Sequence, residues 1–166
     1  MKHSILISLG SNLGVCSKNL KNAIALMDSR PELRVERASE IYLTEPQDCK
    51  DQPWFCNQVA MLSGTADLTA RALLKILKGI ESQLGREKCS IFKGPRIIDL
   101  DILDFDGQVH NDQKLVLPHP GMKHRAFVLV PLRQIRPEYV FPDGVTIDDA
   151  LSAINCRVNG NKIFQS

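Results

Sequence analysis

The apolar positions of this chain alternate between the spacing of strands and that of helices. SILISLGS near the start is a short apolar run that stops at Gly10, and WFCNQVAMLSG is a longer run of the same kind, so both predict strands. Apolar residues recur at three- and four-residue intervals from Leu20 to Met27 and from Leu68 to Leu84, which predicts two amphipathic helices. Ser11 or Asn12 is expected to cap the first of these helices.

The order of all the expected elements indicates the fold class. Further elements are an extended segment at 33–44, a strand at 97–103, a hairpin turn at Asp106-Gly107 leading into 108–110, a short helix from about Phe127 to before Pro137, and a helical turn or two at 148–154. This order predicts one α+β domain over residues 1–166 with a ferredoxin-like βαββαβ core. We expect an antiparallel sheet with helices packed on one face and extra C-terminal elements.

Two aspartates stand one residue apart inside the apolar stretch GPRIIDLDILDF. Because strand side chains alternate between faces, Ile98, Leu100 and Ile102 are expected to pack on helices. Asp99 and Asp101 then project together from the opposite face. Two like charges on one rigid surface destabilise a strand unless a cation lies between them, and magnesium commonly takes one or two carboxylates together with substrate phosphates. The pair predicts a magnesium site, with a solvated strand face as the alternative.

Basic residues flank the aspartates in the sequence. They lie in the loop GREKCSIFKGPR and in the later segment KLVLPHPGMKHR, and they are Arg86, Lys88, Lys93, Arg96, Lys114, His119, Lys123, His124 and Arg125. Carboxylates that need magnesium, next to arginines and lysines, are what an ATP triphosphate requires, although a single lysine is more often a solvated surface charge. The sequence contains neither of the glycine-rich phosphate-binding motifs G-x-x-x-x-G-K-(S/T) and G-x-G-x-x-G. Side chains and metal are therefore expected to hold the triphosphate.

The composition argues against several other partners. A net charge of +2 is too small to indicate nucleic acid or an anionic membrane. No apolar run approaches the roughly 18 residues of a membrane span, and no basic-apolar leader opens the chain. Five cysteines at scattered spacings, without a CxxC pair, predict reduced thiols. We therefore expect a soluble cytoplasmic protein without an obligate protein partner.

Four sequence blocks together resemble one known family. GSNLG, DQPWFCNQV, GPRIIDLDIL and LPHPGMKHRAFVLVPL occur in the order typical of the 6-hydroxymethyl-7,8-dihydropterin pyrophosphokinases of folate biosynthesis. The resemblance runs from Ile5 to about Gly144. It implies a transferase that moves the β,γ-pyrophosphate of ATP to the hydroxymethyl group of the pterin and releases AMP.

The resemblance also implies roles for individual residues on the ATP side. Asp99 and Asp101 match the residues that hold two magnesium ions against the triphosphate, and Arg86 and Arg96 match catalytic arginines. The other matches to ATP-contacting positions are Glu81, Lys88, Ile102, Lys114, His119 and Arg125. Loops 44–53 and 85–95 are expected to close over the substrates and exclude water.

On the pterin side, Phe55 and Phe127 match two aromatic positions that sandwich the flat ring. Asn57 matches the amide that hydrogen-bonds the ring edge, and Thr44 and its neighbours are expected to add backbone contacts. Without the resemblance, both phenylalanines would be taken for core residues, whereas an amide in mid-strand already requires partners.

Three positions depart from the family pattern, and all lie in one loop. Lys88 replaces a common arginine, Phe92 replaces a charged residue, and Lys93 stands where some members have a tryptophan. The first change removes a bidentate guanidinium. All three bear on loop closure and on ATP affinity.

Three other functions fit parts of the pattern. An RNA-binding module on a ferredoxin-like sheet needs exposed aromatic residues and a basic face, but aromatic residues make up only 5% of the chain and the RNP1 pattern is absent. Another magnesium-dependent transferase or nuclease has no use for Phe55, Asn57 and Phe127. A relative that only binds ligands has no use for an intact Asp99 and Asp101.

Overall fold

The computed structural model describes residues 3–46, 51–86 and 94–166. The elements in these ranges are β1 (His3–Ser11), α1 (Cys16–Asp28), β2 (Leu33–Ala38), β3 (Tyr42–Thr44), β4 (Phe55–Gly64), α2 (Ala70–Gln83), β5 (Asp99–Phe105), β6 (His110–Asn111), β7 (Val116–Leu117), the 3₁₀ helix η1 (Met122–His124), α3 (Ala126–Ile135), α4 (Ile147–Ser152), β8 (Cys156–Asn159) and β9 (Lys162–Gln165). No helix in the described part of the chain is both long and apolar enough to cross a membrane.

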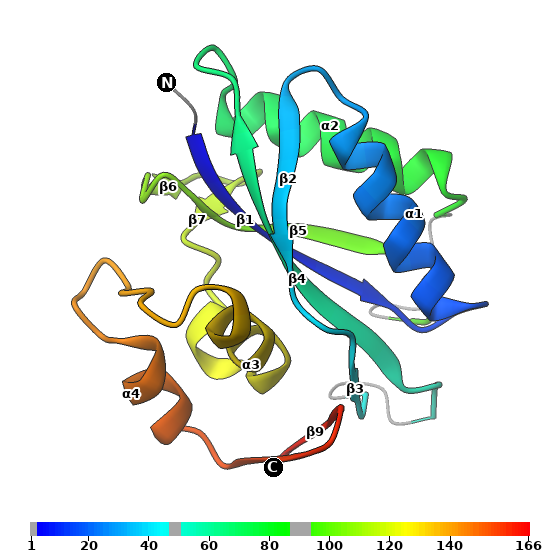
Figure 1. The fold of residues 1–166 in the computed structure, drawn as a ribbon, viewed down its shortest axis with the longest axis vertical. Coiled ribbons are helices and arrows are strands. Elements are labelled where there is room, and N and C mark those ends of the chain that lie inside the picture. The colour runs from blue at the N-terminus through cyan, green and yellow to red at the C-terminus, as the bar shows by residue number, and fades with distance from the viewer. Residues whose placement is uncertain (1–2, 47–50, 87–93) are drawn as a thin grey trace.

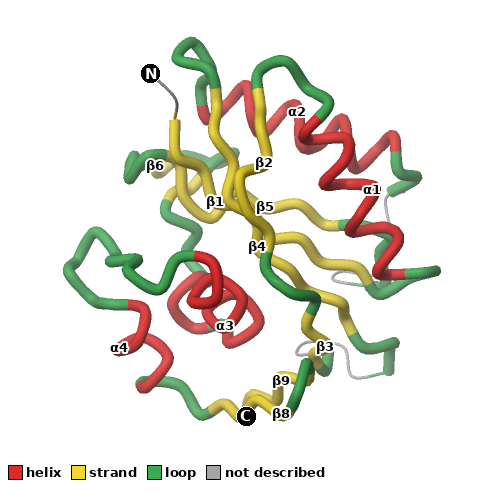
Figure 2. Tube along the Cα trace, viewed as in Figure 1, coloured by secondary structure: helices red, strands yellow, loops and turns green. Residues whose placement is uncertain are grey.

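In the described ranges, seven strands form one mixed sheet (Figures 1 and 2). Its order is β5-β1-β4-β3-β9-β8, and β2 pairs with the half of β4 that β3 leaves free. β1 is antiparallel to both of its neighbours, β4 and β5. The α+β class is confirmed.

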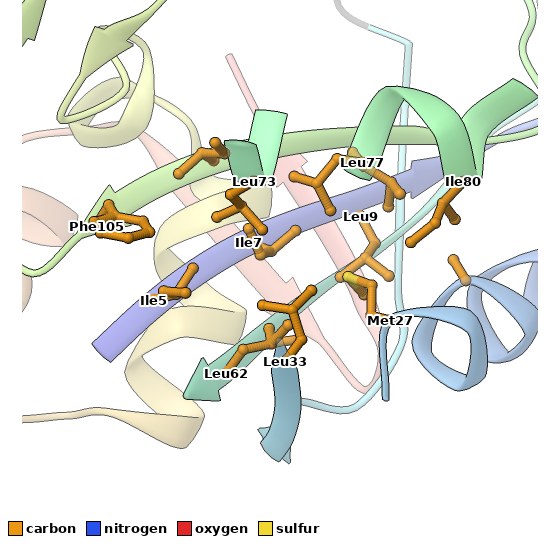
Figure 3. Close-up of a cluster of buried hydrophobic side chains, with 14 of the residues drawn as sticks. Ile5, Ile7, Leu9, Met27, Leu33, Leu62, Leu73, Leu77, Ile80 and Phe105 are labelled. Atoms are coloured by element: carbon orange, nitrogen blue, oxygen red, sulfur yellow. The ribbon is translucent and has the colours of Figure 1, made fainter. Parts of the chain in front are cut away.

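Helices α1 and α2 cover one face of the sheet (Figure 3). Ile5, Ile7 and Leu9 point from β1 toward this layer, where they meet Met27 of α1 and Leu77 of α2. All five side chains are fully buried, and each contributes about 1.5–3 kcal/mol by leaving water. The strand and helix periods seen in the sequence therefore converge on one core.

Helix α3 packs on the opposite face and α4 packs against α3, so the expected packing of helices on one face holds for α1 and α2 but not for α3. Leu6 of β1 and Val59 of β4 lie in a second apolar cluster with Leu129 and Leu132 of α3. Leu6 and its neighbour Ile7 are both completely buried because the central strand is covered on both sides. The unbroken apolar run at the start of the sequence has this physical cause.

The sequence predicted an antiparallel sheet, but the observed sheet contains one parallel pair of strands. β9 pairs in parallel with β3, placing Leu43 beside Lys162 and Thr44 beside Ile163. The hairpin of β8 and β9 was not expected, because its short strands CRVN and KIFQ show little alternation of apolar and polar residues. It brings the end of the chain next to β3.

Two local features, the start of α1 and the turn after β5, test the prediction in detail. β1 continues through the buried Ser11, and α1 begins only at Cys16 after Val15, which forms no side-chain cap, so the predicted cap at Ser11 or Asn12 is wrong. The turn at Asp106-Gly107 is confirmed: both residues have positive φ, of 54° and 67°. The segment after this turn pairs as β6 with β7 rather than with β5.

Candidate active site

A cavity of about 600 Å³ opens on the α3 side of the sheet. Strands β1, β4 and β5 form its floor, and the start of α3 and the end of β9 contribute to its wall. The described residues that line it are Ser8, Gly10, Thr44, Glu45, Phe55, Asn57, Lys78, Arg86, Arg96, Asp99, Asp101, Leu103, His119, His124, Arg125, Phe127, Val128 and Gln165.

The register of three neighbouring strands sets the floor of the cavity. Gly10 of β1 pairs with Asn57 of β4 on one side and with Asp99 of β5 on the other. Since paired strands lie about 4.8 Å apart, the Cα atoms of Asn57 and Asp99 are separated by roughly 10 Å. A Cβ atom at Gly10 would lie 3.4 Å from Oδ1 of Asn57. The glycine therefore keeps the floor open between an amide and an acidic residue.

The expected alternation along β5 is confirmed. Leu100 and Ile102 are buried in the core beneath α2, whereas Asp99 and Asp101 line the cavity. Burial and the neighbouring charge of Asp99 both raise the pKa of Asp101. Two carboxylates held on one partly buried surface favour a bound cation.

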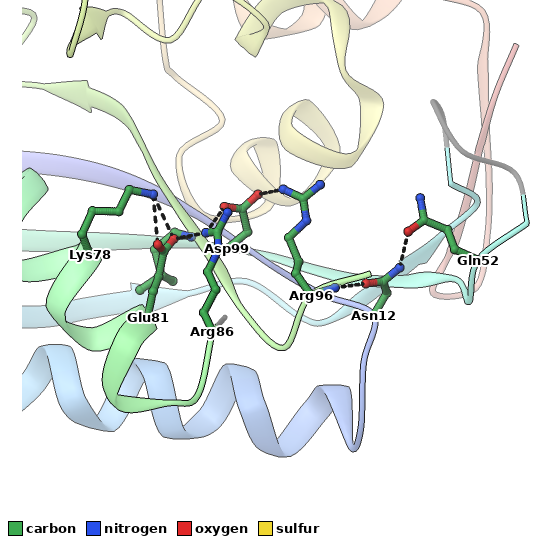
Figure 4. Close-up of polar contacts among 8 residues, drawn as sticks. Asn12, Gln52, Lys78, Glu81, Arg86, Arg96 and Asp99 are labelled. Atoms are coloured by element: carbon green, nitrogen blue, oxygen red, sulfur yellow. Dashed lines mark hydrogen bonds and ion pairs between the residues drawn. The ribbon is translucent and has the colours of Figure 1, made fainter. Parts of the chain in front are cut away.

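Two arginines pair with Asp99 and neutralise its charge (Figure 4). Nη1 of Arg86 donates to Oδ1 of Asp99 at 2.5 Å, and Nη1 of Arg96 donates to Oδ2 at 2.6 Å. The three side chains are only 22–27% exposed, so these charge-assisted bonds are stronger than those of an open surface pair. The arginines therefore lie where they can exchange a carboxylate for a phosphate.

Glu81 of α2 ties one of these arginines to the strand that carries the aspartates. Its Oε1 accepts hydrogen bonds from the backbone N–H of Leu100 at 2.7 Å and from Arg86 at 2.5 Å, and Lys78 reaches both of its oxygens at 3.0–3.1 Å. Burial raises the pKa of Glu81, although these donors act in the opposite direction. Glu81 itself does not line the cavity, so its observed contacts are those of a support for Arg86.

Asn12 positions the second arginine from the end of β1 (Figure 4). Its Oδ1 accepts from the backbone N–H of Arg96 at 2.8 Å, and its own backbone N–H donates to the carbonyl of Arg96 at 3.1 Å. Its Nδ2 donates to Oε1 of Gln52 at 3.0 Å and to the carbonyl of Pro53 at 3.2 Å. One buried amide thus joins β1, the segment before β4 and the approach to β5.

The opposite end of the cavity is uncharged at its floor. Asn57 donates from Nδ2 to Oγ1 of Thr44 at 2.6 Å, and both residues are buried. Phe55 and Phe127 line the same cavity from β4 and α3. An amide with two partly buried aromatic rings can recognise a flat heterocycle by edge hydrogen bonds and stacking.

The segment before α3 supplies Arg125 and His119 to the cavity. The guanidinium of Arg125 lies 5.7 Å from the ring centroid of Phe127. His119 accepts the Gly121 N–H at Nδ1, so its neutral ring carries the proton on Nε2. Burial lowers the pKa of His119, and Asp101 acts in the opposite direction.

The structure brings ten of the predicted site residues together around the cavity. They are Thr44, Phe55, Asn57, Arg86, Arg96, Asp99, Asp101, His119, Arg125 and Phe127. The side chain of Ile102 lies in the core, and Lys114 is exposed on the segment between β6 and β7, so neither side chain lines the cavity. Lys88, Phe92 and Lys93 lie outside the described residues, as do parts of loops 44–53 and 85–95. Lys123 pairs with Asp143 instead of facing the cavity.

Sequence reasoning missed several residues that line the cavity, notably Lys78 and Gln165. Lys78 precedes Glu81 by three positions on α2, and this spacing places both on one helix face, so a signal was present. Gln165 carried no such signal, because its position depends on the parallel pairing of β9 with β3.

Comparison with known proteins identifies the family. The sequence model of the family described as 7,8-dihydro-6-hydroxymethylpterin-pyrophosphokinase (HPPK) matches residues 6–137. The 2-amino-4-hydroxy-6-hydroxymethyldihydropteridine pyrophosphokinase of Methylorubrum extorquens is 38% identical over 149 residues, which cover 90% of this chain and 92% of that protein. The chain belongs to the HPPK family. The resemblance seen in the sequence is thereby confirmed, as are the transferase class and the link to folate biosynthesis.

Other relatives include a protein of similar length and longer proteins that this chain matches only in part. The HPPK of Pseudomonas aeruginosa is 37% identical and is matched over 93% of its length, whereas the folic acid synthesis protein fol1 of Schizosaccharomyces pombe is 38% identical over 82% of this chain but only 18% of its own. A crystal structure of an HPPK-DHPS in complex with substrates shares the fold, with a TM-score of 0.72 at 14% identity. That match covers 98% of this chain, and the chain spans about half the length of that structure, 49%.

Proposed function

We propose that this HPPK chain transfers pyrophosphate from MgATP to 6-hydroxymethyl-7,8-dihydropterin within the cavity on the α3 side of the sheet. The pterin lies at the end formed by Thr44, Phe55, Asn57 and Phe127. The triphosphate lies at the end formed by Asp99, Asp101 and the basic residues around them. The single observation that carries this proposal is the pairing of Gly10 with both Asn57 and Asp99, which places the two ends on one continuous floor.

The two aspartates fit a magnesium site that is completed by substrate. Asp99 and Asp101 offer carboxylate oxygens, the ligands that magnesium prefers, and burial together with the charge of Asp99 raises the pKa of Asp101. In the described ranges no group of three or more His, Cys, Asp or Glu side chains could hold a metal ion. A site with two protein carboxylates therefore needs phosphate oxygens and water, as is common for nucleotide-bound magnesium. We propose two Mg²⁺ ions, which would neutralise charge on the phosphates.

The residues of the chain position the reacting groups and stabilise charge. The hydroxymethyl oxygen of the pterin attacks the β-phosphorus of ATP, the bond from that phosphorus to the oxygen bridging it to the α-phosphate breaks, and AMP leaves while the hydroxyl proton is released. Arg86 and Arg96 exchange Asp99 for phosphate oxygens, and Arg125 and His119 face the same space. Such a transfer depends mainly on alignment and charge stabilisation. Glu81, Lys88, Ile102 and Lys114 are proposed as further ATP contacts, although the side chains of Glu81, Ile102 and Lys114 do not line the described cavity.

The ring-binding end determines which acceptor enters. Asn57 reads the donor and acceptor edge of the pterin, and its bond to Thr44 fixes the orientation of the amide. Phe55 and Phe127 hold the ring faces, a contact worth about 0.5–1.5 kcal/mol beyond the buried area. A hydroxyl compound without a flat ring of this kind is therefore expected to be a poor acceptor.

Product analysis tests the proposed reaction directly. The protein is mixed with ATP, Mg²⁺ and 6-hydroxymethyl-7,8-dihydropterin, and AMP is separated from ADP by chromatography. We expect AMP only when pterin and Mg²⁺ are both present, in an amount equal to the pterin consumed. Release of ADP would show simple kinase chemistry, and AMP formed without pterin would show hydrolysis, so either product would contradict the proposal.

Matched variants separate the site from the rest of the fold. Asp99→Asn keeps the shape of the side chain but removes its charge, so AMP formation should be lost. Asp148→Asn changes an exposed carboxylate on α4 whose one ion-pair partner among the described residues is the exposed Arg133, and it should retain wild-type activity. Equal activity in both variants would remove the magnesium role from the proposal.

The proposal also covers the domain organisation and the fold around the site. We propose that residues 1–166 form a single pyrophosphokinase domain and that β1, α1, β2, β4, α2 and β5 form a ferredoxin-like core. The order β5-β1-β4-β2 and the antiparallel pairing of these strands support this reading. We propose an enzyme whose partners are small molecules. We also propose a cytoplasmic location, which the free thiols of Cys16, Cys56 and Cys156 support.

A further inference from the structure

The end of the chain reaches the active-site cavity through β9. Parallel pairing with β3 sets Ile163 beside Thr44, and the buried Ile163 packs with Tyr42 and Ala126. Gln165 follows two residues later, so its side chain leaves the strand on the same face as that of Ile163. This face is turned toward the start of α3, and Gln165 lines the cavity there.

The side-chain amide of Gln165 binds the backbone on both sides of one residue, Arg125. Its Oε1 accepts from the N–H of Ala126 at 2.8 Å, and its Nε2 donates to the carbonyl of His124 at 2.7 Å. Arg125 lies between these two peptide groups in an extended conformation, with φ −118° and ψ 108°. Two hydrogen bonds from one planar amide fix the orientation of both peptides, and therefore the direction in which the Arg125 side chain leaves the backbone.

The contact also replaces a missing helix cap. Arg125 is the N-cap residue of α3, and its own side chain accepts no hydrogen bond from the helix. The first N–H groups of a helix have no partner within the helix, and Ala126 is completely buried, so water cannot easily serve its N–H. Gln165 supplies that acceptor from a strand 39 residues further along the chain.

We propose that Gln165 is a positioning residue for pyrophosphoryl transfer. It acts through Arg125, which faces the triphosphate, and through Phe127, which faces the pterin ring. Both residues belong to the backbone turn that Gln165 holds, and His124, Arg125, Phe127 and Gln165 all line the cavity. This inference rests on the proposed function for the roles of Arg125 and Phe127.

The chemistry of the side chain explains why an amide is needed here. Glutamine carries an acceptor and a donor on one planar group, whereas ionised glutamate only accepts and lysine only donates. The bond to the buried Ala126 N–H is the harder one to replace, because the hydrogen bond to His124 lies in a more exposed position. Gln165→Glu therefore keeps the more important half of the contact, and Gln165→Ala loses both halves.

Steady-state kinetics of AMP formation give the first test. Gln165→Ala is expected to raise KM for ATP and KM for the pterin about tenfold each, while kcat falls less than threefold. Gln165→Glu should recover at least half of this loss on a logarithmic scale. Ser166→Ala is the matched control, since the Ser166 hydroxyl bonds only with Asn155 in the described structure and should leave both KM values unchanged. Wild-type KM values in Gln165→Ala would overturn the proposal.

Double variants show whether Gln165 acts through its two targets. In a Phe127→Ala background, Gln165→Ala should change KM for the pterin less than twofold, and in an Arg125→Ala background it should change KM for ATP less than twofold. Full additivity of the separate effects would mean general loss of structure rather than positioning, and would overturn the proposal.

Amide hydrogen exchange tests the same contact without any substrate. Gln165→Ala should speed exchange of the Ala126 N–H at least tenfold, while core amides of β1 keep their wild-type protection. Unchanged exchange at Ala126 would overturn the proposal even in an active enzyme. A wild-type protein that forms no AMP would contradict the proposed function, while the exchange measurement would still decide whether Gln165 holds this turn.

Discussion

The two ends of the cavity are built in different ways. At the pterin end, a buried amide and a hydroxyl are joined by one hydrogen bond, and two partly buried rings stand beside them. At the triphosphate end, carboxylates and cations contact one another across β5, α2 and the approach to β5. One end has an uncharged floor that is held mainly by sheet pairing, and the other is charged and held by ion pairs.

This difference follows from what each end must bind. A flat, neutral ring is recognised by a fixed surface, and β4 supplies one because β1 and β3 pair with it on either side of Asn57. In the proposed reaction, a triphosphate with magnesium would replace existing ion pairs, so the basic residues must be able to leave Asp99. Charges that neutralise each other lower the energetic cost of holding them together.

The largest effect is expected at the charged end. Asp101→Asn should lower kcat about a thousandfold, because loss of one group that stabilises transition-state charge has an effect of this size. Binding of the pterin alone should stay within twofold of wild type, as measured by fluorescence titration. A variant that kept even a tenth of wild-type kcat would show that Asp101 does not hold a reacting group.

A smaller but equally selective effect is expected at the neutral end. Asn57→Ala should weaken pterin binding about 30–100-fold, because a hydrogen-bonding site loses about 2–3 kcal/mol when polar groups are left unpaired. Calorimetry should show ATP affinity unchanged. Gln58→Ala is the matched control: Gln58 is the next residue on β4, and its amide bonds to the carbonyl of Ser39, so the variant should lose stability but keep pterin affinity.

The floor between the ends can be blocked at Gly10. Gly10→Val should lower kcat about 30-fold, since a displacement of about 1 Å between reacting groups has effects approaching a hundredfold. Valine suits a strand, so thermal stability should change little. Gly79→Ala, on an exposed part of α2, serves as control and should keep full activity, because no described atom outside its own stretch of helix lies within 4 Å of the added Cβ. Wild-type kcat in Gly10→Val would separate the two ends into independent sites.

The smallest expected effect is on the pH dependence of stability. The native pKa of Asp101 is raised by burial and by Asp99, so ionisation destabilises the folded state relative to the unfolded chain. Asp101→Asn should therefore have a higher free energy of unfolding than the wild-type protein at pH 7. This advantage should shrink as the pH falls through the raised pKa toward 3.8, where both states are protonated. The stability change in Asn57→Ala should not vary with pH over the same range, as denaturant titrations at several pH values would show.

Much of the fold could be predicted from the sequence because its signals are local. The period of two in β5 correctly placed Leu100 and Ile102 in the core and the aspartates opposite them. The position of α1 followed from its apolar spacing, but its cap did not, because Asn12 uses its side chain to bind Arg96 rather than the helix. Tertiary contacts decided that point.

The missed parts of the site depend on contacts between distant segments. Gln165 reaches α3 only because β9 pairs in parallel with β3, and such a pairing leaves no period in a four-residue strand. The packing of α3 on the second face was likewise hidden, since the buried run in β1 resembles any buried strand. Residues recognised through the family, such as Asn57, were found because their chemistry is tied to a sequence block rather than to packing.

A crystal structure of the ternary complex would test the central claim most directly. The protein is crystallised with Mg²⁺, α,β-methylene ATP, in which the bond to be broken is replaced, and 6-hydroxymethyl-7,8-dihydropterin. We predict the ring between Phe55 and Phe127 with its edge on Asn57, and the phosphates beside Asp99 and Asp101, with the hydroxymethyl oxygen above Gly10 and facing the β-phosphorus. A pterin bound outside this cavity, or a triphosphate distant from both aspartates, would contradict the account.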